Sequence, residues 1–152
     1  MGDSELDKFA EKTQAEIIRE LKEIYSPVVI DHWLNPRNWG IMNDADGYAK
    51  ITGPCGDTME FSIKIKNDRI THCTFDTDGC GTTIACASIA AEMTIGKNIN
   101  EARKINQAAL LQYCGGLPDE NKHCALLASN TLQKTIDNCL ANKQEPWRRL
   151  YE

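Results

Sequence analysis

Hydrophobic and polar residues alternate most regularly in the middle of the chain. Between residues 58 and 66 every second side chain is apolar, which is the period of a strand with one buried face. The apolar positions are Met59, Phe61, Ile63 and Ile65. Asn67-Asp68 predicts a tight turn into a second strand over 69–76, and a further strand is expected over 47–52. The pattern therefore predicts a three-stranded antiparallel sheet with one face in water.

Helical spacing dominates on both sides of these strands. Residues 5–24 repeat apolar side chains at a period near 3.6 and predict an amphipathic helix, and Pro27 favours a short helix over 28–34. After the strands, an alanine-rich helix is expected over 82–95. Two short helices should follow over 101–106, capped by Asn100, and over 107–114. A long last helix is predicted over 123–142, with these residues facing inward: Leu126, Leu127, Leu132, Ile136 and Leu140.

Strands followed by helices predict an α+β fold, a three-stranded antiparallel sheet with helices packed on one of its faces. A chain of 152 residues has the size of one ordinary domain with its own core. We expect an N-terminal helical extension over 1–24, a single domain over 25–142 and a short C-terminal tail over 143–152.

The net charge of −5 changes which partners are expected. An acidic domain lacks the basic surface that binds nucleic acid, so we expect no nucleic-acid partner. No apolar run approaches the roughly 20 residues that cross a bilayer, and the charged start does not resemble a secretory signal. These features predict a cytoplasmic protein without a membrane partner.

Seven cysteines are the chemically distinctive feature of the composition. Their odd number and the expected compartment argue against a disulfide framework and favour metal or thiol chemistry. Four of them lie within apolar regular elements and are predicted to be buried core thiols. These four are Cys73, Cys86, Cys114 and Cys139.

The other three cysteines lie at junctions between predicted elements. Cys55 is in the loop Gly53-Pro54-Cys55-Gly56-Asp57, Cys80 precedes the alanine-rich helix, and Cys124 follows His123 at the start of the last helix. A helix N-terminus lowers the pKa of a thiol, which favours the thiolate at Cys80 and Cys124. Asp57 or His123 would be the fourth ligand of a shared site.

Three interpretations of these cysteines remain open on the residues alone: unrelated surface thiols, a structural zinc site, or a labile metal or cluster site. Structural zinc usually takes ligands in close sequence pairs, which are absent here. An oxygen ligand beside three thiolates would favour exchange of a bound metal over its permanence. The spacing of the cysteines does not decide between zinc and a cluster.

Several motifs in the same order resemble the IscU/NifU N-terminal family of iron–sulfur cluster assembly scaffolds, from about residue 25 to about residue 141. The first motif is Tyr25-Ser26 with Val29-Ile30-Asp31-His32-Trp33 and Asn35-Pro36-Arg37-Asn38. The others are Gly53-Pro54-Cys55-Gly56-Asp57, Asp78-Gly79-Cys80-Gly81-Thr82, and Leu117-Pro118 followed by His123-Cys124. The short spacing from Cys80 to His123 and the presence of that histidine resemble the IscU branch rather than the zinc-dependent SufU branch.

This resemblance implies that the chain is a scaffold, not an enzyme. It implies that an iron–sulfur cluster, expected to be [2Fe–2S], is built from iron and desulfurase-derived sulfur and passed to apo-proteins. Cys55, Cys80 and Cys124 would be ligands, with Asp57 and His123 as exchangeable fourth ligands and zinc as a further occupant of the apo form. The implied partners are a cysteine desulfurase, a ferredoxin-like electron donor, apo-protein acceptors and a second copy in a homodimer.

Two details of mechanism are expected from the local sequence. Cys124 beside His123 is the candidate for the first sulfur acceptor, as a persulfide, with Cys55 as runner-up. Asp57 is expected to set how readily the cluster leaves. The alternatives are a zinc-binding sulfur acceptor that carries no cluster and a protein in which a metal only tightens the fold. His32 and His72 are expected to be core or surface histidines, because no nucleophilic triad or phosphate loop appears.

The chain departs from the family at two places. Where the family has Leu-Pro-Pro-Val-Lys, this sequence has Leu117-Pro118-Asp119-Glu120-Asn121-Lys122, which puts recognition by a specialised Hsp70 in doubt. The helix before Tyr25 is the second departure. It is expected either to cover the core or a partner surface, or to be solvated decoration.

Overall fold

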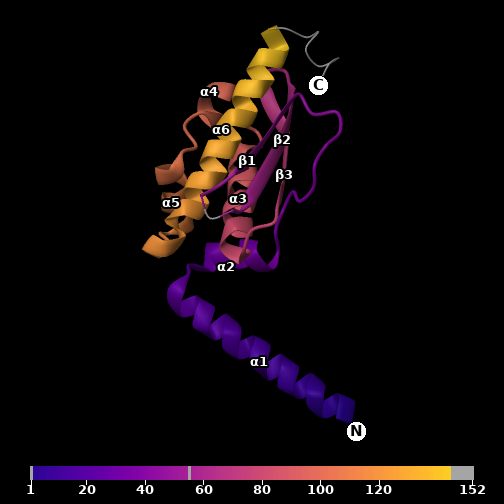
Figure 1. Ribbon diagram of the computed structural model, residues 1–152, viewed down its shortest axis with the longest axis vertical. Coiled ribbons are helices and arrows are strands. Elements are labelled where there is room, and N and C mark those ends of the chain that lie inside the picture. Colours follow the sequence, from indigo (N-terminus) through magenta and orange to yellow (C-terminus); the bar gives the residue numbers. More distant parts are fainter. Residues whose placement is uncertain (1, 55, 145–152) are drawn as a thin grey trace.

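A computed structural model describes residues 2–54 and 56–144 (Figure 1). The elements in chain order are α1 (Gly2–Ile24), α2 (Pro27–Leu34), β1 (Gly47–Thr52), β2 (Thr58–Lys66), β3 (Arg69–Thr77), α3 (Gly81–Thr94), α4 (Ile99–Ala102), α5 (Gln107–Cys114), the 3-10 turn η1 (Asp119–Asn121) and α6 (Lys122–Gln144). The predicted α+β fold is confirmed.

The sheet has the order β1-β2-β3, and both pairs of strands are antiparallel. Asn67 and Asp68 have φ of 55° and 64°, the left-handed conformation of a two-residue hairpin turn, and this turn sets the register in which Phe61 faces Phe75. Helices α3 and α6 pack against the sheet, and α6 crosses it diagonally (Figure 1).

The core fills the space between the sheet and these two helices. The strands contribute large side chains, including Met59, Phe61 and Phe75, all fully buried. The alanine-rich α3 is buried on nearly all sides, since small side chains let neighbouring elements approach it closely. The four cysteines predicted to be core thiols are all buried, so that prediction is confirmed.

The segment after α2 protects the outer edge of β3. Phe75 donates its N–H to the carbonyl of Asn38 at 3.0 Å, and Gly40 donates its N–H to the carbonyl of Phe75 at 2.7 Å. An exposed strand edge invites pairing with other chains, and these two bonds occupy it. The outer face of the sheet is polar as predicted, although Ser62 is fully buried there. Its hydroxyl accepts the N–H of Met42 at 3.2 Å.

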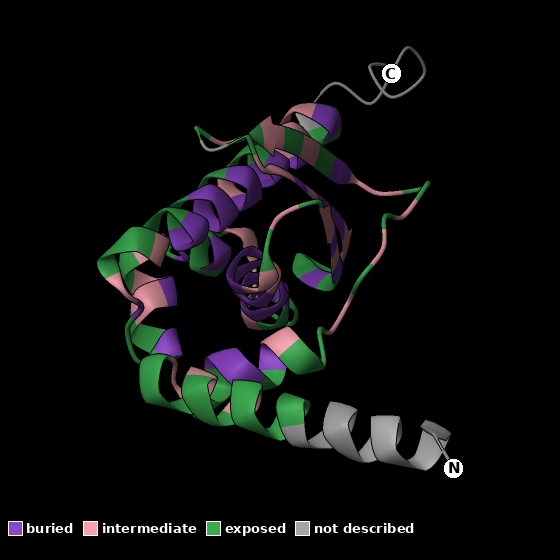
Figure 2. Ribbon diagram, turned by 60° about the horizontal axis from the view of Figure 1, so that its bottom comes forward, coloured by how far each residue is buried: buried purple, intermediate pink, exposed green. Residues whose placement is uncertain are grey.

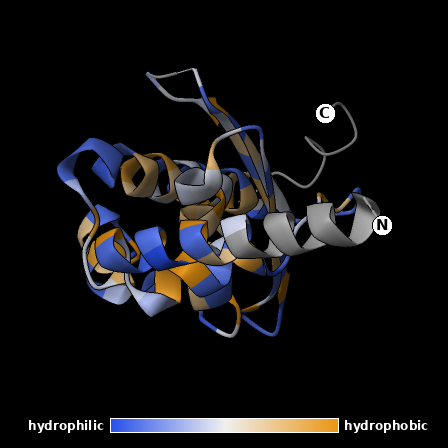
Figure 3. Ribbon diagram, turned by 90° about the horizontal axis from the view of Figure 1, so that it is seen from below, coloured by the Kyte–Doolittle hydropathy of each residue, from blue (hydrophilic) through white to orange (hydrophobic). Residues whose placement is uncertain are grey.

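Helix α1 extends away from the body of the molecule (Figure 1). Ile17 and Ile24 are 51% and 57% exposed. Figure 2 shows the described turns of α1 as mainly exposed, and Figure 3 shows hydrophilic and hydrophobic residues interleaved along them. Of the two expectations for this helix, covering the chain's own core is wrong for the described residues. The two expectations that remain for α1 are that it forms a surface for a partner or that it is solvated decoration.

Three expectations about helix positions need correction. The short helix expected over 101–106 is α4, Ile99–Ala102, because Asn98 rather than Asn100 accepts the capping N–H, that of Glu101 at 2.8 Å. Leu126 is 43% exposed, since the buried stripe of α6 passes through Ala125, Ala128 and Leu132 and leaves Leu126 outside. The last helix reaches Gln144, and the rest of the predicted tail lies outside the described residues.

Within residues 2–54 and 56–144, no helix has both the length and the apolar character needed to cross a bilayer.

Candidate functional site

The loop between β1 and β2 places Asp57 at the start of β2. Gly53 donates its N–H to the carbonyl of Asp57 at 2.7 Å, and Gly56 donates to the carbonyl of Gly53 at 3.0 Å. Gly56 has φ of 90°, which favours glycine because a side chain there would strain the backbone. These bonds close the loop tightly and leave Asp57 half-buried. Cys55, the predicted ligand within the loop, lies outside the described residues.

The junction between β3 and α3 is held by side chains on both strands. Thr58 donates its N–H to the Asp78 carboxylate at 2.7 Å, and the Thr77 hydroxyl donates to the carbonyl of Thr58 at 2.6 Å. The chain then enters α3 at Cys80, which is the N-cap residue with an extended backbone and an exposed side chain. Cys80 therefore presents its thiol to solvent from a fixed position.

His123 and Cys124 lie in the first turn of α6. Gln107 of α5 donates to the carbonyl of Lys122 at 3.1 Å and anchors this end of the helix. The two neighbours differ in exposure, since His123 is exposed and Cys124 is 1% exposed. His123 Nε2 is 3.7 Å from Cys124 Sγ.

The hydroxyl of Thr83 joins three of the predicted ligands. Its Oγ1 is 3.2 Å from Asp57 Oδ2, 3.3 Å from Cys124 Sγ and 3.6 Å from Cys80 Sγ. The structure thus brings Asp57, Cys80 and Cys124 together around one buried side chain, with His123 beside Cys124. Among the described residues, no three histidine, cysteine or acidic side chains already surround a single metal position. Thr83 occupies the middle of the group.

The two described junction thiols have opposite pKa shifts. Burial raises the pKa of Cys80, but the Thr83 N–H and hydroxyl and the Thr82 N–H lower it by more, so its pKa lies below the ordinary value. Burial raises the pKa of Cys124 to about 11, and the nearby Cys80 and Asp57 oppose a second negative charge. The predicted lowering of the thiol pKa is therefore confirmed for Cys80. It is wrong for Cys124, because the burial of this thiol outweighs the effect of the helix end.

A second set of residues packs next to the candidate ligands and holds their segments in place. Thr82 donates to the Tyr25 hydroxyl at 3.3 Å, and Tyr25 donates to Asn121 Oδ1 at 3.1 Å, just before His123. Trp33 packs edge-on against Tyr25, with 5.7 Å between the centroids of the two rings. The Trp33 indole also fills the space beside Gly81, where an added Cβ would lie 1.8 Å from an indole carbon. These contacts explain why aromatic residues recur in the first motif and why a glycine follows Cys80.

Thr83 is the residue that the sequence reasoning missed. It lies three positions after Cys80, and residues at that spacing share one side of a helix. Its hydroxyl was therefore predictable as a neighbour of the Cys80 thiol. Its approach to Asp57 and Cys124 depends on how three distant segments pack, which the spacing of residues does not give.

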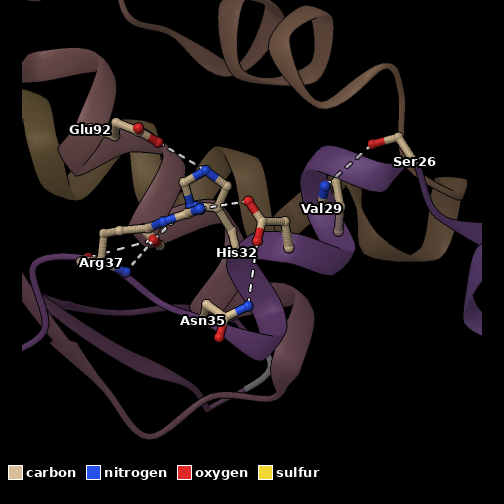
Figure 4. Close-up of polar contacts among 8 residues, drawn as sticks. Ser26, Val29, His32, Asn35, Arg37 and Glu92 are labelled. Carbon is tan, nitrogen blue, oxygen red and sulfur yellow. Dashed lines mark hydrogen bonds and ion pairs between the residues drawn. The ribbon is translucent and has the colours of Figure 1, made fainter. Parts of the chain in front are cut away.

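The two remaining histidines lie outside this group, as expected. His72 is exposed on β3. His32 is buried, with Nδ1 2.7 Å from Ser88 Oγ and Nε2 2.9 Å from Glu92 of α3, and Figure 4 shows it beside Arg37. Arg37 in turn pairs with Asp31 at 2.5 Å. This cluster joins α2 to α3 and is structural.

Comparison with known proteins places the chain among proteins of cluster assembly. The family model described as "NifU-like N terminal domain" matches residues 24–145. Iron-sulfur cluster assembly scaffold protein IscU 1 of Archaeoglobus fulgidus is 46% identical over 114 residues, which are 74% of each chain. The corresponding protein of Aquifex aeolicus is 41% identical over 119 residues, 76% of each chain.

A solved structure supports the fold alone. It is described as a scaffold protein for the SUF system from Fervidobacterium islandicum and is 23% identical, with a TM-score of 0.61 over 75% of this chain and 97% of that one. The family match covers most of the sequence, and the gathered Asp57, Cys80, His123 and Cys124 lie inside it. The chain belongs to the NifU-like N-terminal domain family.

Proposed function

We propose that this protein is a scaffold on which an iron–sulfur cluster is assembled and from which the cluster is passed to apo-proteins. The observation that carries the proposal is the gathering of Asp57, Cys80 and Cys124 around Thr83. Three separate segments deliver soft sulfur and hard oxygen donors to one partly open place. Such a mixed set suits iron that arrives, is held and leaves again.

Cys80 and Cys124, together with Cys55 of the first loop, are the proposed sulfur ligands. Asp57 and His123 are the proposed exchangeable fourth ligands. Only a carboxylate and an imidazole, and no fourth thiolate, are offered among the described residues at the site, so the cluster would be held less firmly than in a site with four cysteines. A [2Fe–2S] centre is the proposed product. The chain acts as a carrier, with iron and sulfide as its cargo.

Sulfur would enter the site through Cys80 and be held on Cys124. Cys80 is exposed and its pKa is lowered, so it is the thiol that a persulfide of a cysteine desulfurase can meet as a thiolate. The Thr83 hydroxyl lies 3.6 Å from Cys80 Sγ and 3.3 Å from Cys124 Sγ, so the two thiols share one neighbour. This proposal revises the expectation from the local sequence, because the exposed Cys80, rather than Cys124, is now the proposed first sulfur acceptor. Cys124 is proposed to hold the persulfide next, where burial shields it from water and oxidants.

The proposed partners follow from this chemistry. A cysteine desulfurase gives the sulfur, a ferredoxin-like protein gives electrons, and apo-proteins take the cluster. An Hsp70 chaperone is left out of the proposal, because the stretch before His123 carries the exposed ion pair of Asp119 with Lys122 in place of the family's motif.

Anaerobic reconstitution tests the proposal. The protein is incubated with ferrous iron, cysteine and a cysteine desulfurase, desalted, and examined by visible absorption and by counting iron and acid-labile sulfide. The wild type should gain a coloured centre, whereas Cys80→Ser and Cys124→Ser should lose most of it. Cys139→Ala is the matched control, a buried cysteine on the same helix as Cys124, and should reconstitute normally.

The same experiment distinguishes the scaffold from the zinc-binding sulfur acceptor. A zinc-binding sulfur acceptor would bind one zinc and accept a persulfide, but it would stay colourless and hold no sulfide after desalting. Zinc with no coloured centre in the wild type, under conditions in which an established scaffold is reconstituted, would overturn the proposal.

A further inference from the structure

A tyrosine hydroxyl joins the two helix starts that carry the described sulfur ligands. The Tyr25 hydroxyl donates to Asn121 Oδ1 at 3.1 Å, and the Thr82 hydroxyl donates to the Tyr25 oxygen at 3.3 Å. Asn121 is the last residue of η1, and Thr82 is the second residue of α3. Three side chains from separate segments therefore form one continuous hydrogen-bonded bridge, Thr82–Tyr25–Asn121.

Each end of the bridge lies close in the chain to a candidate ligand. Asn121 is followed within three residues by His123 and Cys124, and Thr82 comes two residues after Cys80. Such short connections leave little slack, because consecutive Cα atoms are held about 3.8 Å apart. The bridge therefore limits how far the start of α6 can move from the start of α3.

Packing holds the bridge in place. The Tyr25 ring lies edge-on against Trp33, Thr82 is 2% exposed, and Asn121 is half-buried. The turn at Asn121 is closed by its own N–H, which donates to the carbonyl of Pro118 at 2.8 Å. Water competes poorly for hydrogen bonds in such partly buried places, so the bridge can persist in solution.

The same two helix starts also meet through a ligand atom. Thr83 Oγ1 lies 3.3 Å from Cys124 Sγ. Iron that binds Cys124 would compete with this contact for the sulfur. The bridge contains no ligand atom, so it can keep the two helix starts together while a metal is bound.

We propose that Asn121, acting through Tyr25, is a positioning residue that holds His123 and Cys124 close enough to Cys80 for the three to bind one metal ion or cluster. This inference deepens the proposed function and rests on it. Residues that orient metal ligands from outside the metal site commonly set its affinity, and loss of one weakens metal binding about 10- to 100-fold.

This role depends on a hydrogen-bond acceptor at position 121. An amide oxygen accepts the proton of Tyr25, whereas the ammonium group of a lysine has three donors and no acceptor. Lysine is the fifth residue of the family's Leu-Pro-Pro-Val-Lys motif, and Asn121 is the fifth residue of the stretch that begins at Leu117 here. The bridge therefore arises where this chain departs from the family's motif.

Cobalt(II) tests the inference without a cluster. It is a coloured substitute for iron or zinc, and thiolate ligands give it charge-transfer absorption that neutral or oxygen ligands do not. Anaerobic titration of the reduced full-length protein gives both the affinity and the thiolate absorption. The variants are Tyr25→Phe, Asn121→Ala, the double variant of these two, Asn121→Lys and Asn121→Asp.

Two further variants are matched controls. Tyr48→Phe removes a hydroxyl that is hydrogen-bonded to Glu60 on the outer face of the sheet. Asn130→Ala shortens an exposed asparagine of α6. Both controls should bind cobalt with the affinity and the thiolate absorption of the wild type.

Loss of the bridge should weaken cobalt binding. Tyr25→Phe, Asn121→Ala and Asn121→Lys should each bind about tenfold more weakly than the wild type. Asn121→Asp keeps an acceptor oxygen and should bind at least as tightly as the wild type. The double variant should bind no more weakly than either single variant, because each single change already breaks the same bridge.

Unchanged affinity in Tyr25→Phe and Asn121→Ala would overturn the inference. Effects that add in the double variant would overturn it too, since independent losses of structure add. If the wild type shows thiolate absorption and the single variants match it, only the bridge is refuted and the scaffold function stands. If the wild type binds cobalt without any thiolate absorption, the proposed function and this inference both fail.

Discussion

A single hydroxyl at Thr83 controls the neighbourhood of the candidate ligands. A hydroxyl has one proton to donate and two lone pairs to accept with. Thr83 can therefore donate to Asp57 or to Cys124, but not to both at once, although both lie within 3.3 Å. The direction in which the Thr83 hydroxyl donates decides whether Asp57 or Cys124 is hydrogen-bonded. The other residue is then free to bind iron.

Replacing Thr83 by valine keeps its shape and removes the hydroxyl. The pKa of the Cys80 thiol should rise, because the Thr83 hydroxyl is one of the groups that lower it. The measurement is the pH dependence of Cys80 alkylation, read by peptide mass spectrometry, with the curve moving to higher pH in Thr83→Val. Thr83→Ser keeps the hydroxyl and should follow the wild type, and an unchanged curve in Thr83→Val would refute this role.

Removal of the Asp57 carboxylate should make a bound cluster last longer. Its oxygen competes for iron with the thiolates and is a weaker ligand for a cluster than sulfur is. Asp57→Ala should therefore bleach more slowly in air, by several-fold, and transfer its cluster more slowly to an apo-ferredoxin. Asp46→Ala, on the loop before β1, is the control for a lost acidic charge. Faster bleaching of Asp57→Ala would contradict the role given to this carboxylate.

At the scale of residues, the properties that depend on neighbours in the chain were predictable from the sequence. The three junction cysteines and the four core cysteines were separated by their neighbours in the chain, and the four core positions are buried. The pKa of Cys124 was not predictable, because it depends on burial under α3 and on the charges of Cys80 and Asp57, which come from distant segments.

At the scale of elements, the junction of α2 with α3 depends on one buried histidine. His32 contacts Ser88 through one ring nitrogen. The other ring nitrogen contacts Glu92 (Figure 4). The pKa of His32 is lowered, first by burial and then by the charge of Arg37, while Glu92 and Asp31 act in the opposite direction. The neutral imidazole is therefore the form that the fold prefers.

This preference predicts how stability depends on pH. The unfolded chain takes up a proton at His32 from about pH 6.5 downward, whereas the folded chain resists it until a lower pH. The free energy of unfolding should therefore fall as the pH is lowered through about 6.5. His32→Gln should lose about 1–3 kcal/mol at pH 7.5, where a buried contact is broken, and show a smaller decline toward pH 5. Denaturant titrations at both pH values, with exposed His72→Gln as the control, measure this.

Helix α1 is predictable from its own periodicity, but its place in the molecule is not. Its apolar spacing resembles that of a core-facing helix, and yet Ile17 and Ile24 are exposed. Periodicity identifies an amphipathic helix without saying what covers it. The core cluster is formed by the sheet and the later helices, and it includes no residue of the described turns of α1.

Removal of residues 1–24 should therefore leave the fold intact. The truncated chain should unfold within about 2 °C of the full-length protein in thermal denaturation, since little apolar area is uncovered. Size-exclusion chromatography with light scattering on both chains belongs to the same experiment. If α1 joins two copies, the full-length protein should have the mass of a dimer and the truncated chain that of a monomer. A fall of more than about 10 °C would show that α1 supports the core.

At the scale of the whole molecule, core and site occupy different places. The fully buried side chains of β2, β3, α3 and α6 form a continuous cluster. The described candidate ligands lie at its margin, where loops and helix starts meet, and among these described residues only Cys124 is also a core residue. This division agrees with the sequence, in which the elements of the sheet and core helices were predicted from periodicity and the ligands from the interruptions between them.

The separation of core and site predicts that the fold survives without metal. A structural metal site contributes folding energy directly, so its removal unfolds the protein. Here the apolar cluster is complete without any of the exchangeable ligands, and bound metal should add stability only by mass action. After treatment with a chelator, the protein should keep its near-ultraviolet circular dichroism and unfold cooperatively in denaturant. Returning zinc or ferrous iron should raise the midpoint in proportion to the logarithm of its free concentration, and Cys80→Ser should reduce this rise. Loss of cooperative unfolding in the chelated protein would instead identify the metal as part of the fold and favour the structural-zinc alternative over the scaffold.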